Sequence, residues 1–280
     1  QALEAAKRPS PVRQEPGEEI AQQASLHRDV GKALGLGSIL GTGVFVSLGL
    51  AAGIAGPSVL LGTVLAALLA AANGLSSAQL AANHPVSGGT YEYGYRYLSP
   101  FLGFTAGWTF LIAKSASAAT AALGFAGYLK NTFGPALPLP LVAVAEAAVI
   151  VLTLVVLGGL RRSSHLNAAL VGIAMLSLTA FVLCGLPAAA ERWQGSFFPF
   201  FASPSGEPPL RALFHATALL FVAYTGYGRI ATLGEEVREP GTVIPRAIIT
   251  TMFVVSLLYL GVAATGVGVI GAERFGEAAA

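Results

Sequence analysis

Two short stretches combine glycines with a hydroxyl group inside otherwise apolar sequence. The first is Gly41–Gly43, with Thr42 at its centre, and the second is Tyr224–Arg229, which contains Thr225 and Gly226. Glycine permits the main chain to leave a helix, and a broken helix exposes N–H groups with partial positive charge and carbonyls with partial negative charge. The two stretches therefore predict a main-chain binding site for a small zwitterion.

A lysine, Lys114, lies about midway along a third apolar stretch, residues 101–129. A charged side chain at that depth costs several kcal/mol unless it is paired, so it is a functional candidate by default. Three interpretations stay open: a residue that titrates or attracts a carboxylate during function, an ion pair with Glu146 of the next apolar stretch, or a structural lysine that reaches an interface.

The elements that position these residues follow from the composition. The chain is 54% hydrophobic and only 11% charged, whereas about a quarter of the residues of a soluble domain are charged. About 20 apolar residues cross the roughly 30 Å of hydrocarbon in a bilayer, and seven blocks qualify: 31–54, 57–82, 101–129, 139–158, 165–186, 210–232 and 246–270. Blocks this long and this continuously apolar predict helices rather than barrel strands. The expected fold class is all-α, a polytopic transmembrane helix bundle.

The distribution of lysine and arginine predicts the orientation in the membrane. A cytoplasmic N-terminus places 11 of these residues inside and 4 outside, with Lys114 within a span, and this is the bias that cytoplasmic loops show. The inside set is Lys7, Arg8, Arg13, Arg28, Lys32, Arg96, Arg161, Arg162, Arg229, Arg238 and Arg246, and the outside set is Lys130, Arg192, Arg211 and Arg274.

Several classes of function are disfavoured. The net charge is only +2, without a basic cluster, so a nucleic-acid partner is not expected. The single cysteine, Cys184, cannot form an intrachain disulfide or a cysteine-based metal site. The apolar blocks lack a convergent set of acids, bases or metal ligands, so we predict no enzyme activity, no metal and no cofactor.

Three motifs follow one another along the chain: Gly37-Ser-Ile-Leu-Gly-Thr-Gly-Val-Phe45; the loop Pro85-Val-Ser-Gly-Gly-Thr-Tyr-Glu-Tyr-Gly-Tyr95; and Gly234-Glu-Glu-Val-Arg-Glu-Pro240 followed by Ile244-Pro-Arg-Ala247. In sequence, order and spacing they resemble the amino acid permeases of the amino acid–polyamine–organocation superfamily. The resemblance covers about residues 28–270.

The resemblance implies a five-plus-five inverted-repeat (LeuT-like) transporter fold, truncated after the seventh helix. Residues 1–30 would be a cytoplasmic tail, 31–186 the first repeat with helices 1 to 5, and 187–209 an extracellular loop. Residues 210–280 would begin the second repeat with helices 6 and 7, and the remainder would be absent.

The resemblance also implies a site at the unwound segments of helices 1 and 6. The substrate-binding residues would be Ile39, Thr42 and Gly43 in helix 1, and Val222, Thr225 and Gly226 in helix 6, with Val222 and Thr225 acting through their carbonyls. Tyr224 and Tyr227 are candidates for shaping the pocket or its gates, although aromatic residues in membrane helices also serve simply for packing. Glu236 is a candidate for an inner gate.

The implied function is secondary active transport of amino acids or related amines across the plasma or inner membrane by alternating access. A coupling ion, proton or sodium, is possible, and Lys114 is the coupling candidate because Ala174 and Gly228 occupy the positions where proton-coupled relatives carry a lysine and an acid. Two alternatives stay open: a carrier of polyamines or organic cations with the same fold, and a truncated membrane protein that does not transport.

Overall fold

The computed structural model describes residues 39–41, 43–84, 86, 88–134, 138–231 and 240–279. Within these ranges every regular element is a helix, which confirms the predicted all-α class. The elements are η2 Gly43–Ser47, α2 Leu48–Ala55, η3 Gly56–Ser58, α3 Val59–Asn83, α4 Thr90–Tyr97, α5 Pro100–Phe133, α6 Leu141–Leu157, α7 Leu160–Glu191, α8 Trp193–Phe197, α9 Pro209–Tyr224, η5 Thr225–Tyr227, α10 Gly228–Ala231, α11 Pro240–Ile270 and α12 Ala272–Ala279.

Helices occupy all seven predicted apolar blocks, but they differ in length. In the described part of the chain, four helical stretches are long and apolar enough to cross a membrane: Gly43–Asn83, Pro100–Phe133, His165–Glu191 and Gly241–Ile270. The first stretch joins two predicted spans, because the chain between them turns through the short η3 helix instead of a loop. The helices α6 and α9 contain 17 and 16 residues and are therefore shorter than the usual span.

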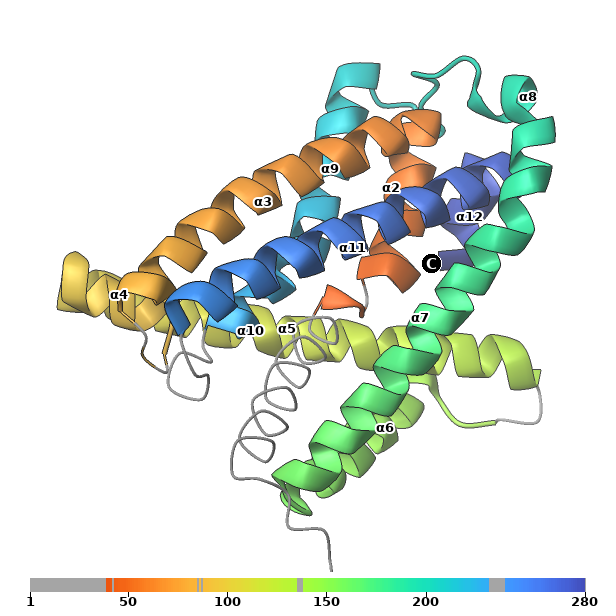
Figure 1. Cartoon of the computed structure of the whole chain (residues 1–280). Coiled ribbons are helices and arrows are strands. Elements are labelled where there is room, and N and C mark those ends of the chain that lie inside the picture. Colours follow the sequence, from red (N-terminus) through yellow and green to blue (C-terminus); the bar gives the residue numbers. More distant parts are fainter. Residues whose placement is uncertain are drawn as a thin grey trace, which may run out of the picture.

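A stripe of small residues on α3 organises the core. Its members recur every fourth position and are all buried: Gly62, Ala66, Ala70, Gly74 and Ala78. A β-carbon added at Gly62 would lie 3.4 Å from Oγ1 of Thr217 in α9, and one added at Gly74 would lie 3.2 Å from Ile248 in α11. In lipid, helices associate by close packing of such residues, and Figure 1 shows α3 beside α11, with α9 also against α3.

The helices α2, α3, α9 and α11 form a four-helix group. The helices α5, α6 and α7 lie outside this group. Most side chains of α5 and α7 are exposed, and α5 meets α6 through a small cluster that includes Ala126 and Ala145. The helix α7 lies along α11, where a β-carbon at Gly261 would lie 3.1 Å from Val182. Figure 1 shows α5 crossing below the core and α7 along one side of it.

The segment between α3 and α5 differs from the expected loop, because its second half is the helix α4. The chain turns at Gly89, with φ of 55°, and becomes helical at Thr90. The ring of Tyr95 in α4 then packs directly on Gly103 of α5. This contact is a tertiary interaction, which the local sequence does not reveal. The segment is rich in glycine and aromatic residues, and its sequence therefore did not predict a helix.

Candidate functional site

The first helix is interrupted at the predicted glycines. Ile39 is helical, Leu40 and Gly41 form a bend, and the chain resumes as the π-helix η2 before α2 begins at Leu48. The Gly41 N–H donates to the Ile39 carbonyl at 2.9 Å, two residues back, instead of four as in an α-helix. Thr42, a predicted substrate residue, lies outside the described residues.

The second interruption is a change of winding. The α-helical hydrogen bonding of α9 ends at Tyr224, and Thr225–Tyr227 form a 3-10 turn that leads into α10. The Val222 carbonyl accepts two hydrogen bonds from Thr225, one from the main-chain N–H and one from the side-chain hydroxyl, whose Oγ1 lies at 2.7 Å. A carbonyl has two lone pairs, so in this conformation Val222 has no acceptor left for an ammonium group. The expected role of its carbonyl therefore requires the Thr225 side chain to turn away.

The two interruptions meet at Gly43. A β-carbon at this position would lie 2.6 Å from the Ala223 β-carbon in α9 and 2.7 Å from the Tyr259 hydroxyl oxygen in α11. Gly43 is buried, so glycine is what lets η2 approach both helices. Gly41 differs, since it is exposed and no described residue lies within 4 Å of a β-carbon built on it. Among the described residues, the free space at this point therefore lies beside Gly41 and not on this face of Gly43.

Two buried tyrosines line the meeting point, and only one of them was a predicted site residue. Tyr224 ends α9, and its ring centroid lies 5.0 Å from that of Tyr259. The Tyr259 hydroxyl donates to the Ile39 carbonyl at 2.9 Å, whereas the buried Tyr224 hydroxyl lies beside Ser256 without a hydrogen bond among the described residues. A signal for Tyr259 exists in the sequence, because a hydroxyl in the middle of an apolar span needs an acceptor.

The other helix-6 candidates are buried in the core, and the gate candidate is not described. Gly226 and Tyr227 are both buried, and the Tyr227 ring lies 3.6 Å from the position of a β-carbon on Gly74 of α3. Tyr227 therefore packs in the core, as the alternative interpretation of the aromatic residues proposed. Glu236 lies outside the described residues.

Lys114 does not pair with Glu146. The α5–α6 contact is centred on Ala126 and Ala145, and Ala126 is 12 residues beyond Lys114, which is about 18 Å along a helix. The Lys114 ammonium instead lies 5.4 Å from the ring centroid of Phe110. It also experiences electrostatic repulsion from Arg229 in α10. Lys114 is exposed in the described chain and makes no ion pair with a described residue.

The loop that precedes α9 connects the C-terminal end of α2 to the start of α9. The hydroxyls of Ser203 and Ser205 both donate to the Ile54 carbonyl, at 2.7 and 3.1 Å. This carbonyl belongs to the last turn of α2, where helical acceptors have no partner within the helix. Next to it, Gly56 has φ of +62°, and a β-carbon there would overlap the Ala202 carbonyl.

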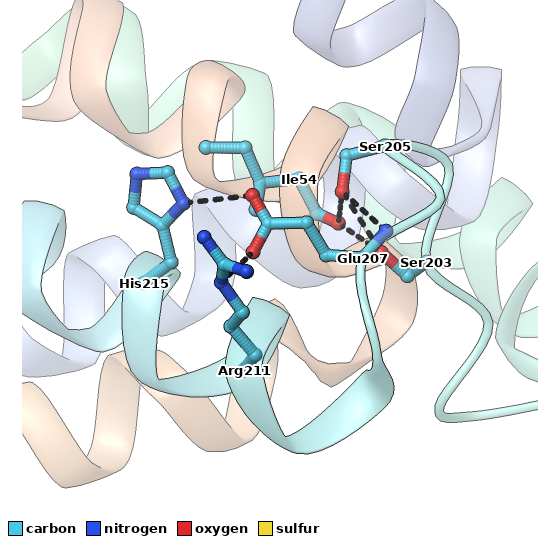
Figure 2. A network of polar contacts seen from close by, with 6 residues as sticks. All are labelled: Ile54, Ser203, Ser205, Glu207, Arg211 and His215. Atoms are coloured by element: carbon cyan, nitrogen blue, oxygen red, sulfur yellow. Dashed lines mark hydrogen bonds and ion pairs between the residues drawn. The ribbon is translucent and has the colours of Figure 1, made fainter.

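The same loop binds the start of α9 through Glu207, as Figure 2 shows. One oxygen of the Glu207 carboxylate lies 3.2 Å from Nδ1 of His215, and the other lies 3.6 Å from Nε of Arg211. The Arg211 side chain is 78% exposed, so water screens this pair and its contribution is small. Together the serines and Glu207 connect the end of α2 to the first two turns of α9.

A separate apolar groove lies between α3 and α11. Its volume is about 480 Å³, and its walls include Leu68, Leu75, Phe253 and Leu257. The walls are almost entirely apolar, so this groove does not suit a zwitterion. The candidate site is therefore the meeting point of the two interruptions.

Comparison with known proteins finds relatives along most of the chain. The family described as amino acid permease matches residues 33–277. An uncharacterized transporter of Mycobacterium tuberculosis is 40% identical over 247 residues, which are 88% of this chain and 53% of that protein. A branched-chain amino acid permease of Bacillus subtilis is 29% identical, covering 90% of this chain and 57% of its own length.

A methylthioribose transporter of Bacillus subtilis is 28% identical, covering 82% of this chain and 51% of its own length. The chain spans about half the length of the curated relatives it matches. These relatives all bear transporter or permease names.

Proposed function

The chain belongs to the amino acid permease family, and from this premise we propose that it works as a secondary transporter that carries amino acids across a membrane. The family assignment confirms the resemblance inferred from the three motifs, and the names of the relatives agree with the prediction that the chain is not an enzyme. The long apolar helices identify an integral membrane protein. Alternating access, the inverted repeat and the substrate site are parts of the proposal.

The observation that carries the proposal is the contact between the two interrupted helices. Irregular main chain at membrane depth is tolerated where it is buried in protein or lines a cavity, and paired interruptions of this kind are typical of substrate sites in transporters. Here η2 touches α9 at Gly43 and Ala223, and no residue that the structure describes lies within 4 Å of a β-carbon on Gly41. We place the substrate beside Gly41 and Thr42, facing Thr225.

Within this proposal, the predicted residues have different roles. Gly43 contributes close packing and the first turn of η2, whose leading N–H groups would bind a carboxylate. The Ile39 carbonyl already accepts two hydrogen bonds, from Gly41 and Tyr259. The Thr225 hydroxyl donates a hydrogen bond to the Val222 carbonyl. If the Thr225 side chain rotated, this carbonyl could accept a hydrogen bond from an ammonium group instead.

The charges near the site favour a substrate without net positive charge. The residues described at the two interruptions, 39–41 and 222–227, are all uncharged. Lys114 of α5 is positively charged and makes no ion pair with a described residue. We therefore propose neutral amino acids as the substrate class, and the cationic alternative, polyamines, is disfavoured by repulsion. Lys114 stays the proposed coupling residue, with proton or sodium as the ion.

Uptake into proteoliposomes tests this proposal. The protein, expressed from its complete reading frame, would be offered labelled leucine, alanine, lysine, glutamate, putrescine and methylthioribose, with pH and sodium gradients varied independently. We expect saturable uptake of the neutral amino acids that is lost when either the carboxylate or the ammonium group is blocked. Uptake of putrescine or methylthioribose without any amino acid would contradict the proposal.

A pair of glycine variants tests the location. Gly41→Leu places a large side chain at the first interruption and should abolish uptake, because no described residue lies within 4 Å of a β-carbon at this position. Gly172→Leu is the matched control, since Gly172 lies on the exposed face of α7 and a β-carbon there also has no described residue within 4 Å. Normal uptake by Gly41→Leu would move the site elsewhere.

A further inference from the structure

Two tyrosine hydroxyls from distant helices donate to main-chain carbonyls of the first interrupted helix. Tyr259 of α11 donates to Ile39, before the interruption, at 2.9 Å. Tyr128 of α5 donates to Phe45, after it, within the π-helix η2. The irregular segment is therefore held on both sides by hydroxyls that belong to other helices.

Both carbonyls lie where the α-helical hydrogen-bonding pattern is interrupted. The Ile39 carbonyl receives the N–H of Gly41, only two residues on, in a bend. In the π-helix each carbonyl bonds five residues ahead, a geometry that occurs mostly as short insertions and often at functional sites. A carbonyl can accept two hydrogen bonds, and main-chain hydrogen bonding is especially important in a membrane interior. A hydroxyl that reaches these carbonyls in the irregular conformation therefore stabilises that conformation relative to an α-helix.

Tyr259 is placed to act on both interruptions. It is fully buried, and its ring packs against Tyr224, the last residue of α9 before the 3-10 turn. Its hydroxyl oxygen also lies 2.7 Å from the position of a β-carbon on Gly43. The Tyr259 side chain therefore lies against Ile39 before the interruption, against Gly43 after it, and against Tyr224 at the end of α9.

Tyr128 acts from the opposite side and is less buried. Its side chain is 43% exposed, and Gly124, one turn earlier on the same face of α5, would bring a β-carbon to 3.2 Å from Val46. The glycine allows α5 to approach η2 closely enough for the Tyr128 hydroxyl to reach Phe45.

We propose that Tyr128 and Tyr259 are positioning residues that fix the non-α conformation of residues 40–41 and 43–47, and that they set substrate affinity through the main chain without touching the substrate. The part that concerns affinity rests on the proposed transport function. The part that concerns conformation does not depend on it. Together the two residues form a tyrosine brace around the interruption.

The test uses Tyr128→Phe and Tyr259→Phe in the protein expressed from its complete reading frame. Each change removes one hydroxyl and keeps the ring. Tyr95→Phe is the matched control, because the Tyr95 ring packs on Gly103 and its hydroxyl makes no hydrogen bond with a described residue. The first readout is amide hydrogen exchange of residues 43–50 in nanodiscs without substrate. The second is the concentration dependence of uptake of a labelled neutral amino acid.

We expect both variants, and not the control, to exchange these amides faster. We also expect a half-saturation concentration raised about two- to tenfold, the range that the net contribution of one hydrogen bond allows, with the maximal rate changed less. A role confined to overall stability would lower the amount of folded protein and the maximal rate and leave the half-saturation concentration unchanged. Because Tyr128 is half-exposed, Tyr128→Phe is informative even if Tyr259→Phe does not fold.

Unchanged exchange in the folded variants, relative to the wild type and Tyr95→Phe, would overturn the tyrosine brace. If exchange accelerates but the wild type takes up no amino acid, the proposed transport function fails and the brace stands. If uptake is saturable and both exchange and half-saturation concentration are unchanged, the brace fails and the transport function stands.

Discussion

At the scale of single residues, the candidate site depends on main-chain groups and on which glycines have room beside them. Gly43 and Gly41 are two positions apart, yet Gly43 is enclosed by Ala223 and Tyr259, whereas a β-carbon on Gly41 has no described residue within 4 Å. The same residue type therefore has two roles in the proposal: Gly43 permits helix contact, and Gly41 leaves room for the substrate. Charged side chains are absent from the described residues of both interruptions, so helix termini supply the local charge.

Gly43→Ala should destabilise the protein by about 1–3 kcal/mol, the usual cost of overpacking a close contact. The added methyl group would lie 2.6 Å from the Ala223 β-carbon and 2.7 Å from the Tyr259 hydroxyl, so helices must separate. Thermal unfolding in detergent measures the effect. Gly41→Ala is the control and should unfold at nearly the wild-type temperature, and equal behaviour of the two variants would refute the contact at Gly43.

Lys114→Met should leave folding unaffected, because Lys114 makes no ion pair with a described residue. Removing this positive charge should raise the uptake of lysine relative to leucine. Competition assays at several pH values, with Lys130→Met as the control at the end of α5, measure the selectivity. If selectivity and pH profile both match the wild type, Lys114 has no part in recognition or coupling.

At the scale of elements, short segments outside the long helices hold the interrupted helices in place. The loop before α9 supplies two serine hydroxyls to the last turn of α2. The helix α12 packs on the same helix, where a β-carbon at Gly276 would lie 2.7 Å from the Cα of Gly53. The helix α2 has only eight residues and is too short to be stable by itself. These contacts therefore hold its C-terminal end in position.

Ser203→Ala and Ser205→Ala should behave cooperatively. Both hydroxyls donate to the Ile54 carbonyl, so either one alone still satisfies it, and each single variant should cost less than about 1 kcal/mol. The double variant leaves the carbonyl without a partner and should cost more than the sum of the single changes. Unfolding temperatures of the three variants form the double-mutant cycle. Additive effects would show that the two serines act independently.

At the scale of the whole molecule, burial divides the helices into two groups. Small residues on α3 pack it against α9 and α11, whereas α5, α6 and α7 present large apolar side chains outward, such as Leu111, Ile150 and Leu176. Exposed apolar side chains on this scale are incompatible with water and suit a membrane environment. The polar network around Glu207 (Figure 2) belongs to the loop before α9, which lies at one end of the core (Figure 1), as expected for a surface that meets water.

Accessibility of introduced cysteines tests the orientation predicted from the lysine and arginine distribution. In a Cys184→Ala background, Gln194→Cys lies on the exposed segment between α7 and α9, and Leu98→Cys lies between α4 and α5. With a cytoplasmic N-terminus, a membrane-impermeant maleimide should label residue 194 in intact cells and residue 98 only after permeabilisation. The reverse pattern would invert the topology.

The amino-acid sequence alone determined the membrane environment, the seven helical blocks and the positions at which two helices change their winding. These properties depend on local composition and length, and Gly41–Gly43 and Tyr224–Arg229 carry them within a few residues. The family also follows from the sequence, because its motifs are local and ordered.

Only the tertiary structure decided what surrounds these positions. Tyr259 meets Ile39 across 220 residues, Ser203 meets Ile54 across 149, and Tyr128 meets Phe45 across 83. Lys114 and Glu146 are closer in sequence than any of these pairs, yet the packing of α5 on α6 keeps them apart. Helix periodicity specifies which face a side chain occupies, but the depth and rotation of neighbouring helices specify its partner.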